Sequence, residues 1–331
     1  MTETPVTART IIVTQPGPAE AMMWQDVPLP DPGTGEIRVR HLAVGVNFLD
    51  ILMRSGRAGA AMPARLGVEG VAVVEAAGPG VDLMPGDRVV YAGGPPGAYS
   101  DRRTMPAARA VRLPDTIAPR EAAALFFKGL TAQYLATRMR PLAPGDPVLV
   151  LAAAGGVGSL LARWLVNRGQ RVIAAVGSAD KVAAATATGA EAVLVVGRDD
   201  IAARVRDLTG GRGVQVVYDS VGRDTWDASV ASLARFGLLV SYGWASGDPA
   251  VDLNPLRNAG SLFVTRPTIA HYTEDPADLQ RAATEVFDLI AAGVLRFDAI
   301  ETLPLDQVAQ AHRRIESRQA RGPVVLMADE G

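Results

Sequence analysis

A glycine-rich turn near the middle of the chain joins an apolar run to an amphipathic run, and this feature constrains the fold more than any other. The apolar run covers residues 147–152 (PVLVLA), the turn is AAGGVG at residues 153–158, and the amphipathic run covers residues 157–168. A buried strand, a tight glycine turn and a helix in this order form the opening unit of a parallel α/β sheet. We therefore expect a strand, a turn and a helix over residues 147–168.

Further apolar runs follow this unit, and each is separated from the next by enough residues for a crossover helix. They cover residues 171–176, 192–196, 214–219 and 237–242, with a shorter run at 261–265. Strands that alternate with helices predict a doubly wound parallel sheet, so the fold class is α/β with a Rossmann-type domain.

The residues before the glycine turn follow a different sequence pattern. Short runs with β-branched residues at 10–14, 36–46, 70–76 and 87–91 are separated by glycine and proline turns, which indicates β-rich structure. After residue 265, a predicted helix at 276–292 precedes segments at 298–303, 305–318 and 324–326 that suggest a return to the first domain. A chain of 331 residues is long enough for two such domains.

Composition excludes several classes of protein. The chain has no cysteine, which rules out disulfides and thiolate metal sites, and its formal net charge is only −2. Because nucleic acids and anionic membranes attract concentrated basic surfaces, neither is expected as a partner. The N-terminal residues lack the pattern of a signal peptide, and no run of about 20 apolar residues is present, so we expect a cytoplasmic protein.

The glycine turn matches the spacing of the dinucleotide fingerprint GxGxxG. Ala153 takes the first position, Gly155 the second and Gly158 the third. Gly155 would let the backbone approach a pyrophosphate, Gly158 would let the helix pack close to the strand, and the helix N-terminus would attract phosphate. The alternative is a tight turn without a ligand, which the following strand and helix units make less favourable.

The end of the second predicted strand lacks the acid that usually binds the ribose of NAD. This strand ends with Val176, Gly177 and Ser178, and Lys181 follows. A carboxylate would repel a 2′-phosphate, whereas Ser178 can donate a hydrogen bond and Lys181 can bring a positive charge, so this segment favours NADPH. Two alternatives stay open: Asp180 as the ribose ligand, and Lys181 as an ordinary solvated helix residue.

The sequence resembles the zinc-independent quinone oxidoreductases of the medium-chain dehydrogenase/reductase superfamily, the NADPH:quinone reductase and zeta-crystallin group. The resemblance covers nearly the whole chain through the motifs GVNFLDILMRSG (45–56), GVEGVAVVEAAGPGV (67–81), PGDRVVYAGGPPGAYS (85–100), FFKGLTAQYL (126–135), AAAGGVG, VYDSVGRDTW (217–226) and GSLFVTRP (260–267). It implies a GroES-like catalytic domain over residues 1–124 and 266–331, an inserted NADPH-binding Rossmann domain over 125–265, and NADPH in the cleft.

The resemblance also implies a set of residues around the cofactor. The catalytic set is Asn47, Lys128 and Thr131. The other implied cofactor contacts, beside Gly155, Gly158, Gly177, Ser178 and Lys181, are Asn47, Tyr134, Gly156, Val157, Ser220, Tyr242, Gly243 and Arg318. The alternatives are ordinary ones: Asn47 and Ser220 as cap or turn residues, the two tyrosines as core, and Arg318 as an exposed helix residue.

Metal is not expected. Zinc-dependent relatives carry a His-Glu pair where Val68 and Glu69 stand here, and His41, His271 and His312 are too scattered for ligand spacing. Relatives also often carry tyrosine at the positions of Leu52 and Val196 and serine at that of Ala245. The loss at Leu52 removes a candidate proton donor, and Arg198 is a candidate to compensate for Val196.

These observations predict an NADPH-dependent quinone reductase that transfers hydride to a quinone or similar conjugated carbonyl without metal. One alternative is an NADPH-dependent enoyl or alkenal reductase, which benefits from a placed acid such as Tyr99. Another is a non-catalytic NADPH-binding protein. The apolar run at 262–264 reads as an edge strand, which predicts a homodimer.

Overall fold

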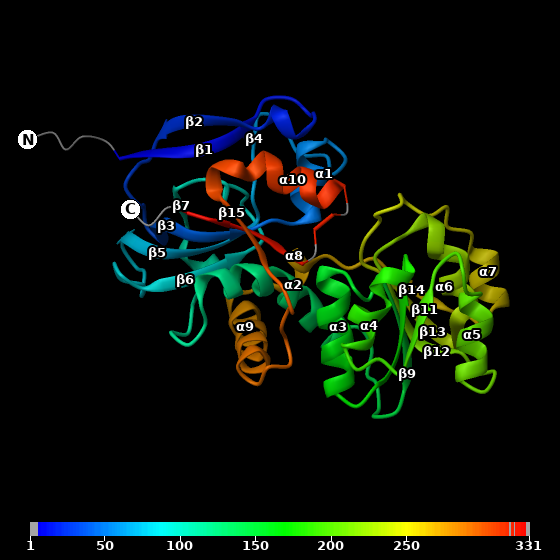
Figure 1. The fold of residues 1–331 in the computed structure, drawn as a ribbon. Coiled ribbons are helices and arrows are strands. Elements are labelled where there is room, and N and C mark those ends of the chain that lie inside the picture. Colours follow the sequence, from blue (N-terminus) through cyan, green and yellow to red (C-terminus); the bar gives the residue numbers. More distant parts are fainter. Residues whose placement is uncertain (1–5, 318, 321, 329–331) are drawn as a thin grey trace, which may run out of the picture. The chain divides into compact units, whose positions relative to one another are not determined.

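The computed structural model describes residues 6–317, 319–320 and 322–328. The chain divides into two compact units (Figure 1). Unit 1 draws on the ranges 1–127, 274–287 and 297–331, and unit 2 draws on 128–273 and 288–296. The chain therefore leaves unit 1 within helix α2 (Pro119–Thr137) and returns to it later, partly through helix α9 (Pro276–Ala291).

Unit 2 contains a parallel sheet of six strands among its described residues, in the order β11-β10-β9-β12-β13-β14. In chain order the strands are β9 (Pro147–Leu151), β10 (Arg171–Val176), β11 (Ala192–Val195), β12 (Val214–Asp219), β13 (Leu233–Ser241) and β14 (Phe263–Thr265). The connecting helices are α3 (Gly156–Asn167), η3 (Ala179–Lys181), α4 (Val182–Thr186), α5 (Ile201–Leu208), η4 (Arg223–Thr225), α6 (Trp226–Ser232), α7 (Leu253–Asn258) and α8 (Ile269–Tyr272).

The strand order of unit 2 fixes where a ligand can bind. Numbered from β9, the order is 3-2-1-4-5-6, which is that of a Rossmann fold. The chain runs from β9 toward one edge of the sheet and then returns to β12 on the other side of β9. Ligands of such sheets bind at the carboxyl ends of the strands beside this switch point. The central strands are buried along nearly their whole length, as expected for a sheet with helices on both faces.

Unit 1 is built on β-sheet. One sheet of described strands runs in the order β15-β16-β3-β5-β6-β8, with β7 also paired to β3, and a smaller sheet runs β2-β1-β4. The strands are β1 (Thr7–Val13), β2 (Met23–Pro28), β3 (Glu36–Gly45), β4 (Ala64–Arg65), β5 (Glu69–Ala77), β6 (Arg88–Ala92), β7 (Arg102–Pro106), β8 (Ala110–Arg112), β15 (Glu301–Pro304) and β16 (Val324–Met327). The helices are η1 (Ala19–Ala21), α1 (Phe48–Arg54), η2 (Ala107–Arg109), η5 (Leu305–Gln307) and α10 (Val308–Glu316), with parts of α2 and α9.

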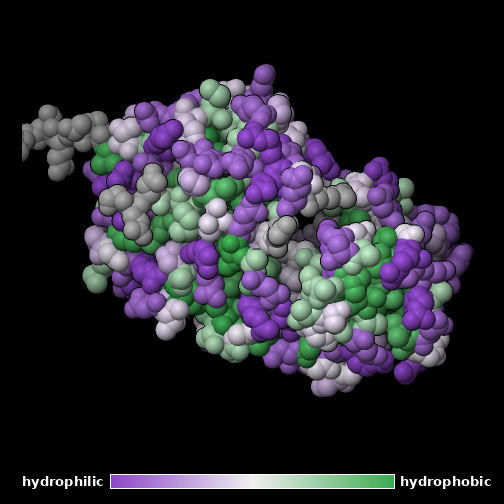
Figure 2. Space-filling model, viewed as in Figure 1, coloured by the Kyte–Doolittle hydropathy of each residue, from purple (hydrophilic) through white to green (hydrophobic). Residues whose placement is uncertain are grey.

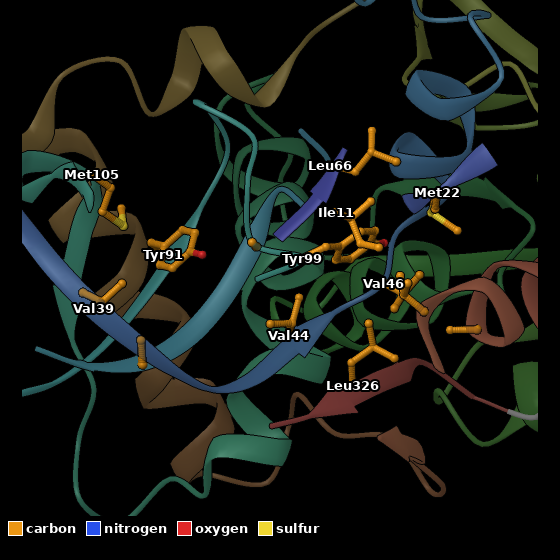
Figure 3. Packing of buried hydrophobic residues seen from close by; sticks show 14 of the residues in the cluster. Ile11, Met22, Val39, Val44, Val46, Leu66, Tyr91, Tyr99, Met105 and Leu326 are labelled. Carbon is orange, nitrogen blue, oxygen red and sulfur yellow. The ribbon is translucent and has the colours of Figure 1, made fainter. Parts of the chain in front are cut away.

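The core of unit 1 joins segments that lie far apart in the sequence. Strand β3 alternates buried and half-buried residues, so one of its faces packs inward. Figure 3 shows Ile11, Val44 and Tyr99 in the same apolar cluster as Leu326 of the C-terminal strand β16. Because β16 pairs with β3, the last strand of the chain completes the core that the first hundred residues begin.

The predicted fold class is confirmed. Two strands differ from the prediction, and each difference has a local cause. Strand β13 begins at Leu233 rather than at the predicted residue 237. The strand includes the exposed residues Arg235 and Phe236, which interrupt the apolar run, and its pairing with β12 shifts register there. Strand β2 was missed because most of its side chains are exposed, which leaves no apolar alternation to detect.

The surface in view mixes hydrophilic and hydrophobic residues over both units (Figure 2). Within the described residues, no helix has the length and apolar character that crossing a bilayer requires.

Candidate functional site

The glycine turn between β9 and α3 has a backbone that excludes side chains. Ala152 directly follows β9 and has a positive φ of 51°, and Gly155 forms the N-cap of α3. A Cβ atom on Gly158 would lie 2.3 Å from the carbonyl oxygen of Ala152, so only glycine permits this close approach of helix to strand. A Cβ on Gly155 would lie 3.0 Å from the same oxygen.

The first turn of α3 can bind an anion. Gly156, Val157 and Gly158 are its first three residues, and the N–H groups of a first turn have no partner inside their own helix. The helix dipole places partial positive charge at this end, and Gly155 in front of it is exposed. The turn therefore has the geometry of a phosphate site at the switch point of the sheet.

Lys128 lies against this turn. Its side chain is only 7 % exposed, and a Cβ on Gly156 would lie 3.1 Å from Lys128 Cδ and 3.3 Å from Cε. The methylene stem of the lysine thus fills the space that the missing side chain of Gly156 leaves. Thr131 lies on the same side of α2 as Lys128, three residues later, and Tyr134 follows Thr131 by the same interval. Sequence reasoning named all three residues, but not the contact between Lys128 and Gly156.

Three tyrosines gather in unit 2. The rings of Tyr134 and Tyr272 stack with centroids 4.4 Å apart. Burial raises the pKa of Tyr134, and the neighbouring hydroxyls of Tyr242 and Tyr272 raise it further. Burial also raises the pKa of Tyr242 to about 12. The phenols of Tyr134 and Tyr242 are therefore protonated at neutral pH and can offer neutral hydroxyls. Tyr272 was not predicted, because a single tyrosine in a polar stretch gives no sequence signal.

Ser220 and Gly243 lie at the carboxyl ends of the neighbouring strands β12 and β13. A Cβ on Gly243 would lie 2.7 Å from the carbonyl oxygen of Ser220, so glycine lets the two loops touch. The N–H of Tyr242 donates to the carbonyl of Asp219 at 2.9 Å. The predicted residues of these two loops are thus brought together beside the switch point.

The carboxyl ends of β10 and β11 carry the charged groups that sequence reasoning assigned to a 2′-phosphate. Gly177 is exposed, and an added Cβ there would meet nothing within 4 Å. Ser178 is half-buried, while Lys181 is exposed and ends η3 rather than lying inside a longer helix. Arg198 follows β11, which pairs with β10, and its guanidinium contacts both carboxylate oxygens of Asp199 at 3.1 and 3.0 Å.

Asn47 belongs to unit 1 and is held by two carboxylates. It forms the N-cap of α1, so the ordinary reading of this residue as a cap is correct. Its backbone N–H donates to Asp50 Oδ2 at 2.9 Å, and its side-chain Nδ2 donates to Glu69 Oε1 at 2.8 Å. Glu69 also accepts a hydrogen bond from the N–H of Phe127 at 3.0 Å. Both carboxylates are fully buried, so the orientation of the Asn47 amide is fixed from two sides.

A second buried polar chain was missed by sequence reasoning, which considered the histidines only as metal ligands. Tyr99 Oη lies 2.9 Å from His312 Nε2, and Arg54 Nη1 lies 3.2 Å from His312 Nδ1. Arg54 also contacts Glu316. Burial raises the pKa of Tyr99, and the negative charge and hydrogen bond of Asp50 raise it further. Tyr99 is fully buried, which disfavours it as a proton donor to a substrate.

The remaining positions named from the sequence differ in their burial. Leu52 is buried in unit 1, Val196 is half-buried after β11, and Ala245 is exposed. Arg318 lies outside the described residues. In the described part of the chain, no three His, Cys, Asp or Glu side chains are placed to hold a metal ion.

Two family models match the chain. Residues 33–115 match the alcohol dehydrogenase GroES-like domain, and residues 156–286 match the zinc-binding dehydrogenase model.

Curated and solved relatives cover nearly the whole chain. A quinone oxidoreductase of Pseudomonas aeruginosa is 42 % identical over 94 % of this chain and 97 % of its own length. A 2-haloacrylate reductase of a Burkholderia species is 38 % identical over 96 % of this chain and 98 % of its own. The crystal structure of Escherichia coli quinone oxidoreductase complexed with NADPH superposes with a TM-score of 0.92, at 39 % identity, over 97 % of this chain and all of the other.

Proposed function

Because this chain belongs to the quinone oxidoreductases of the medium-chain dehydrogenase/reductase superfamily, we propose that it is an NADPH-dependent quinone reductase. One observation carries the proposal: the exposed glycine turn at the N-terminus of α3 lies against Lys128, and Ser178 rather than an acid follows the end of β10, with Lys181 three residues later. A dinucleotide with an additional phosphate fits this distribution of charge.

The residues present fit NADPH. In the glycine turn, a Cβ on Gly158 would collide with the backbone of Ala152. A Cβ on Gly177 would meet only open space. We assign the pyrophosphate to Gly155, Gly156, Val157 and Gly158 and the 2′-phosphate to Ser178 and Lys181. The residues that we assign to the nicotinamide end are Asn47, Lys128, Thr131, Tyr134, Ser220, Tyr242 and Gly243.

Catalysis in this proposal depends on positioning. When bound, NADPH supplies a hydride, and a quinone that accepts it needs one proton to become a hydroquinone. Asn47 orients the reacting groups, since Asp50 and Glu69 hold its backbone and its amide. Lys128 contributes positive charge beside the turn. Leu52 is apolar where a phenol often stands, which suits an acceptor whose oxygen anions take protons from water.

Steady-state assays test this proposal. NADPH oxidation would be measured with a series of benzoquinones and naphthoquinones, with NADH as the matched cofactor. We expect turnover with quinones and a lower KM for NADPH than for NADH. Tight NADPH binding without oxidation by any acceptor would instead support the non-catalytic alternative.

An enoyl or alkenal reductase is the second candidate, and the similarity to the Burkholderia 2-haloacrylate reductase favours it. Reduction of a carbon–carbon double bond requires a proton on carbon, and a placed acid aids that transfer. Leu52 cannot donate a proton, and the Tyr99 hydroxyl is bonded to His312. A higher kcat/KM with 2-chloroacrylate or cyclohexenone than with every quinone would make this candidate the function.

We also propose a homodimer formed through β14. This strand is the edge of the unit 2 sheet, and Phe263 and Val264 on it are 59 % and 38 % exposed. Val251 and Leu253 are also exposed large apolar residues. An apolar edge strand is favourable for pairing with its symmetry mate. The cytoplasm stays the predicted compartment.

A further inference from the structure

The segment after β10 holds an acid among the groups assigned to the 2′-phosphate. Asp180 lies between Ser178 and Lys181, within η3, and is exposed. The N–H of Lys181 donates to the carbonyl of Ser178 at 3.2 Å, which closes the segment into a turn. Ser178 lowers the pKa of the Asp180 carboxyl, and the charge of Lys181 lowers it further. Asp180 therefore places a negative charge in the same turn as the hydroxyl and the ammonium that a 2′-phosphate would need.

The second basic group at this edge is also neutralised. The N–H of Val196 donates to the carbonyl of Val176 at 2.9 Å, so the loops that follow β10 and β11 start side by side. Arg198 pairs with Asp199, and Asp199 Oδ2 accepts the N–H of Val195 at 2.7 Å. Each of the two basic residues at this edge thus has a carboxylate beside it in the sequence, Asp180 beside Lys181 and Asp199 beside Arg198.

We propose that Asp180 is a specificity-determining residue that weakens 2′-phosphate binding and so reduces the preference of this protein for NADPH over NADH. The proposal rests on the proposed function, because it assumes that the dinucleotide binds at the carboxyl ends of β9 and β10. A 2′-phosphate held by Ser178 and Lys181 must lie near the negative charge of Asp180 in the same turn. NADH has no such phosphate, so it does not meet this repulsion.

The test compares Asp180→Asn with Asp207→Asn. Asp207 is an exposed acid in α5 that pairs with Arg204 at 3.4 Å, so its variant removes the same charge from the same unit. Dissociation constants would be measured by fluorescence or calorimetry for NADPH, NADH, 2′,5′-ADP and 5′-ADP. We expect Asp180→Asn to tighten NADPH and 2′,5′-ADP about three- to ten-fold, with NADH and 5′-ADP within twofold. Asp207→Asn should change none of the four.

Two results would overturn the proposal. One is an Asp180→Asn variant with an unchanged ratio of NADPH to NADH affinity; the other is weaker NADPH binding, which would mean that Asp180 only orients Ser178. Asp180→Ala, which cannot hydrogen-bond to Ser178, should reproduce the gain. A wild-type protein that binds neither NADPH nor 2′,5′-ADP would contradict the proposed function itself, whereas unchanged selectivity in a protein that binds both contradicts this inference alone.

Discussion

Tyr99 and His312 are 213 residues apart in the sequence, and their side chains are joined at 2.9 Å inside unit 1. The direction of this hydrogen bond follows from Arg54, which can only donate. His312 Nδ1 must accept from Arg54, so Nε2 carries the proton and donates to Tyr99. A buried arginine and a buried tyrosine are thus connected through a neutral histidine.

Replacement of Tyr99 by phenylalanine should lower the free energy of unfolding by about 1–3 kcal/mol, because buried donors and acceptors would lose their partner. Tyr218→Phe is the matched control: Tyr218 is fully buried, and its hydroxyl has no hydrogen-bond partner among the described residues. Urea unfolding would measure both variants. Equal losses would show that the Tyr99 hydroxyl contributes nothing specific.

Stability should fall as the pH drops below about 6.5. Burial lowers the pKa of His312 to about 3, with Arg54 adding to the effect, and burial and Arg103 lower the pKa of His41 to about 3. Below pH 6.5 the unfolded chain binds protons at these histidines and the folded chain does not. Each histidine then lowers the free energy of unfolding by about 1.4 kcal/mol per pH unit, until the pH reaches the pKa of that histidine in the folded chain.

A comparison of two histidine variants separates the effect of His312 on the pH dependence of stability from the titration of carboxylates. His312→Gln can still accept from Arg54 and donate to Tyr99, and it should remove one histidine's share of the pH dependence between pH 6.5 and 4. Urea midpoints at several pH values would report the slope. His271→Gln, at an exposed position in α8, is the control, and an equal slope in both variants would refute the assignment.

Gly158→Ala should destabilise the protein by about 1–3 kcal/mol and weaken NADPH binding, because its Cβ would collide with the backbone of Ala152. Gly177→Ala should leave thermal stability nearly unchanged, because an added Cβ there meets nothing within 4 Å. Calorimetric unfolding of both variants checks the contrast. Tolerance of alanine at residue 158 would mean that helix α3 can shift without cost.

Lys181→Ala should weaken NADPH binding by about ten- to a hundred-fold, because the variant loses one charge-assisted contact to the 2′-phosphate. NADH affinity should stay nearly unchanged, because NADH lacks this phosphate. The Lys181/Arg198 double alanine variant measures how much Arg198 compensates; because Asp199 already engages Arg198, we expect a small additional loss. Arg204→Ala, on the exposed side of α5, is the control. Wild-type protein with equal affinity for both cofactors would contradict the assignment of Ser178 and Lys181.

Phe263→Asp should convert a dimer into monomers, because the charge would interrupt an apolar strand edge. Light scattering at micromolar concentration measures the mass. Phe236→Asp is the control, since Phe236 is 44 % exposed but lies within β13 rather than on the edge strand. A monomeric wild-type protein would refute the dimer.

Periodicity and glycine spacing were sufficient to predict the parallel sheet. The predicted strand at residues 171–176 coincides with β10, and α3 begins one residue before the predicted helix. These elements are buried on both sides or amphipathic, so their apolar pattern is strong. Exposed strands such as β2 carry no such pattern, and only pairing with β1 defines it.

The site was only partly predictable, because some of its groups act through partners that are distant in sequence. The contact between Lys128 and Gly156 depends on where α2 packs, which no local pattern encodes. His312 is one histidine in a polar helix, and its role becomes visible only when α10 is placed beside Tyr99 and Arg54. Asp180 was recognised as a competing ligand, but its place in a closed turn with Ser178 and Lys181 required the structure.

The pairing of β16 with β3 has a consequence for biosynthesis. A ribosome makes the chain from its N-terminus, so residues 43–45 of β3 exist for most of translation without their partner β16, whereas β7 can pair early with residues 36–40. All strands of the unit 2 sheet lie between residues 147 and 265, so that sheet can close while synthesis continues. The sheet of unit 1 must wait until residue 327 has left the exit tunnel, and until then one end of β3 keeps an unpaired edge.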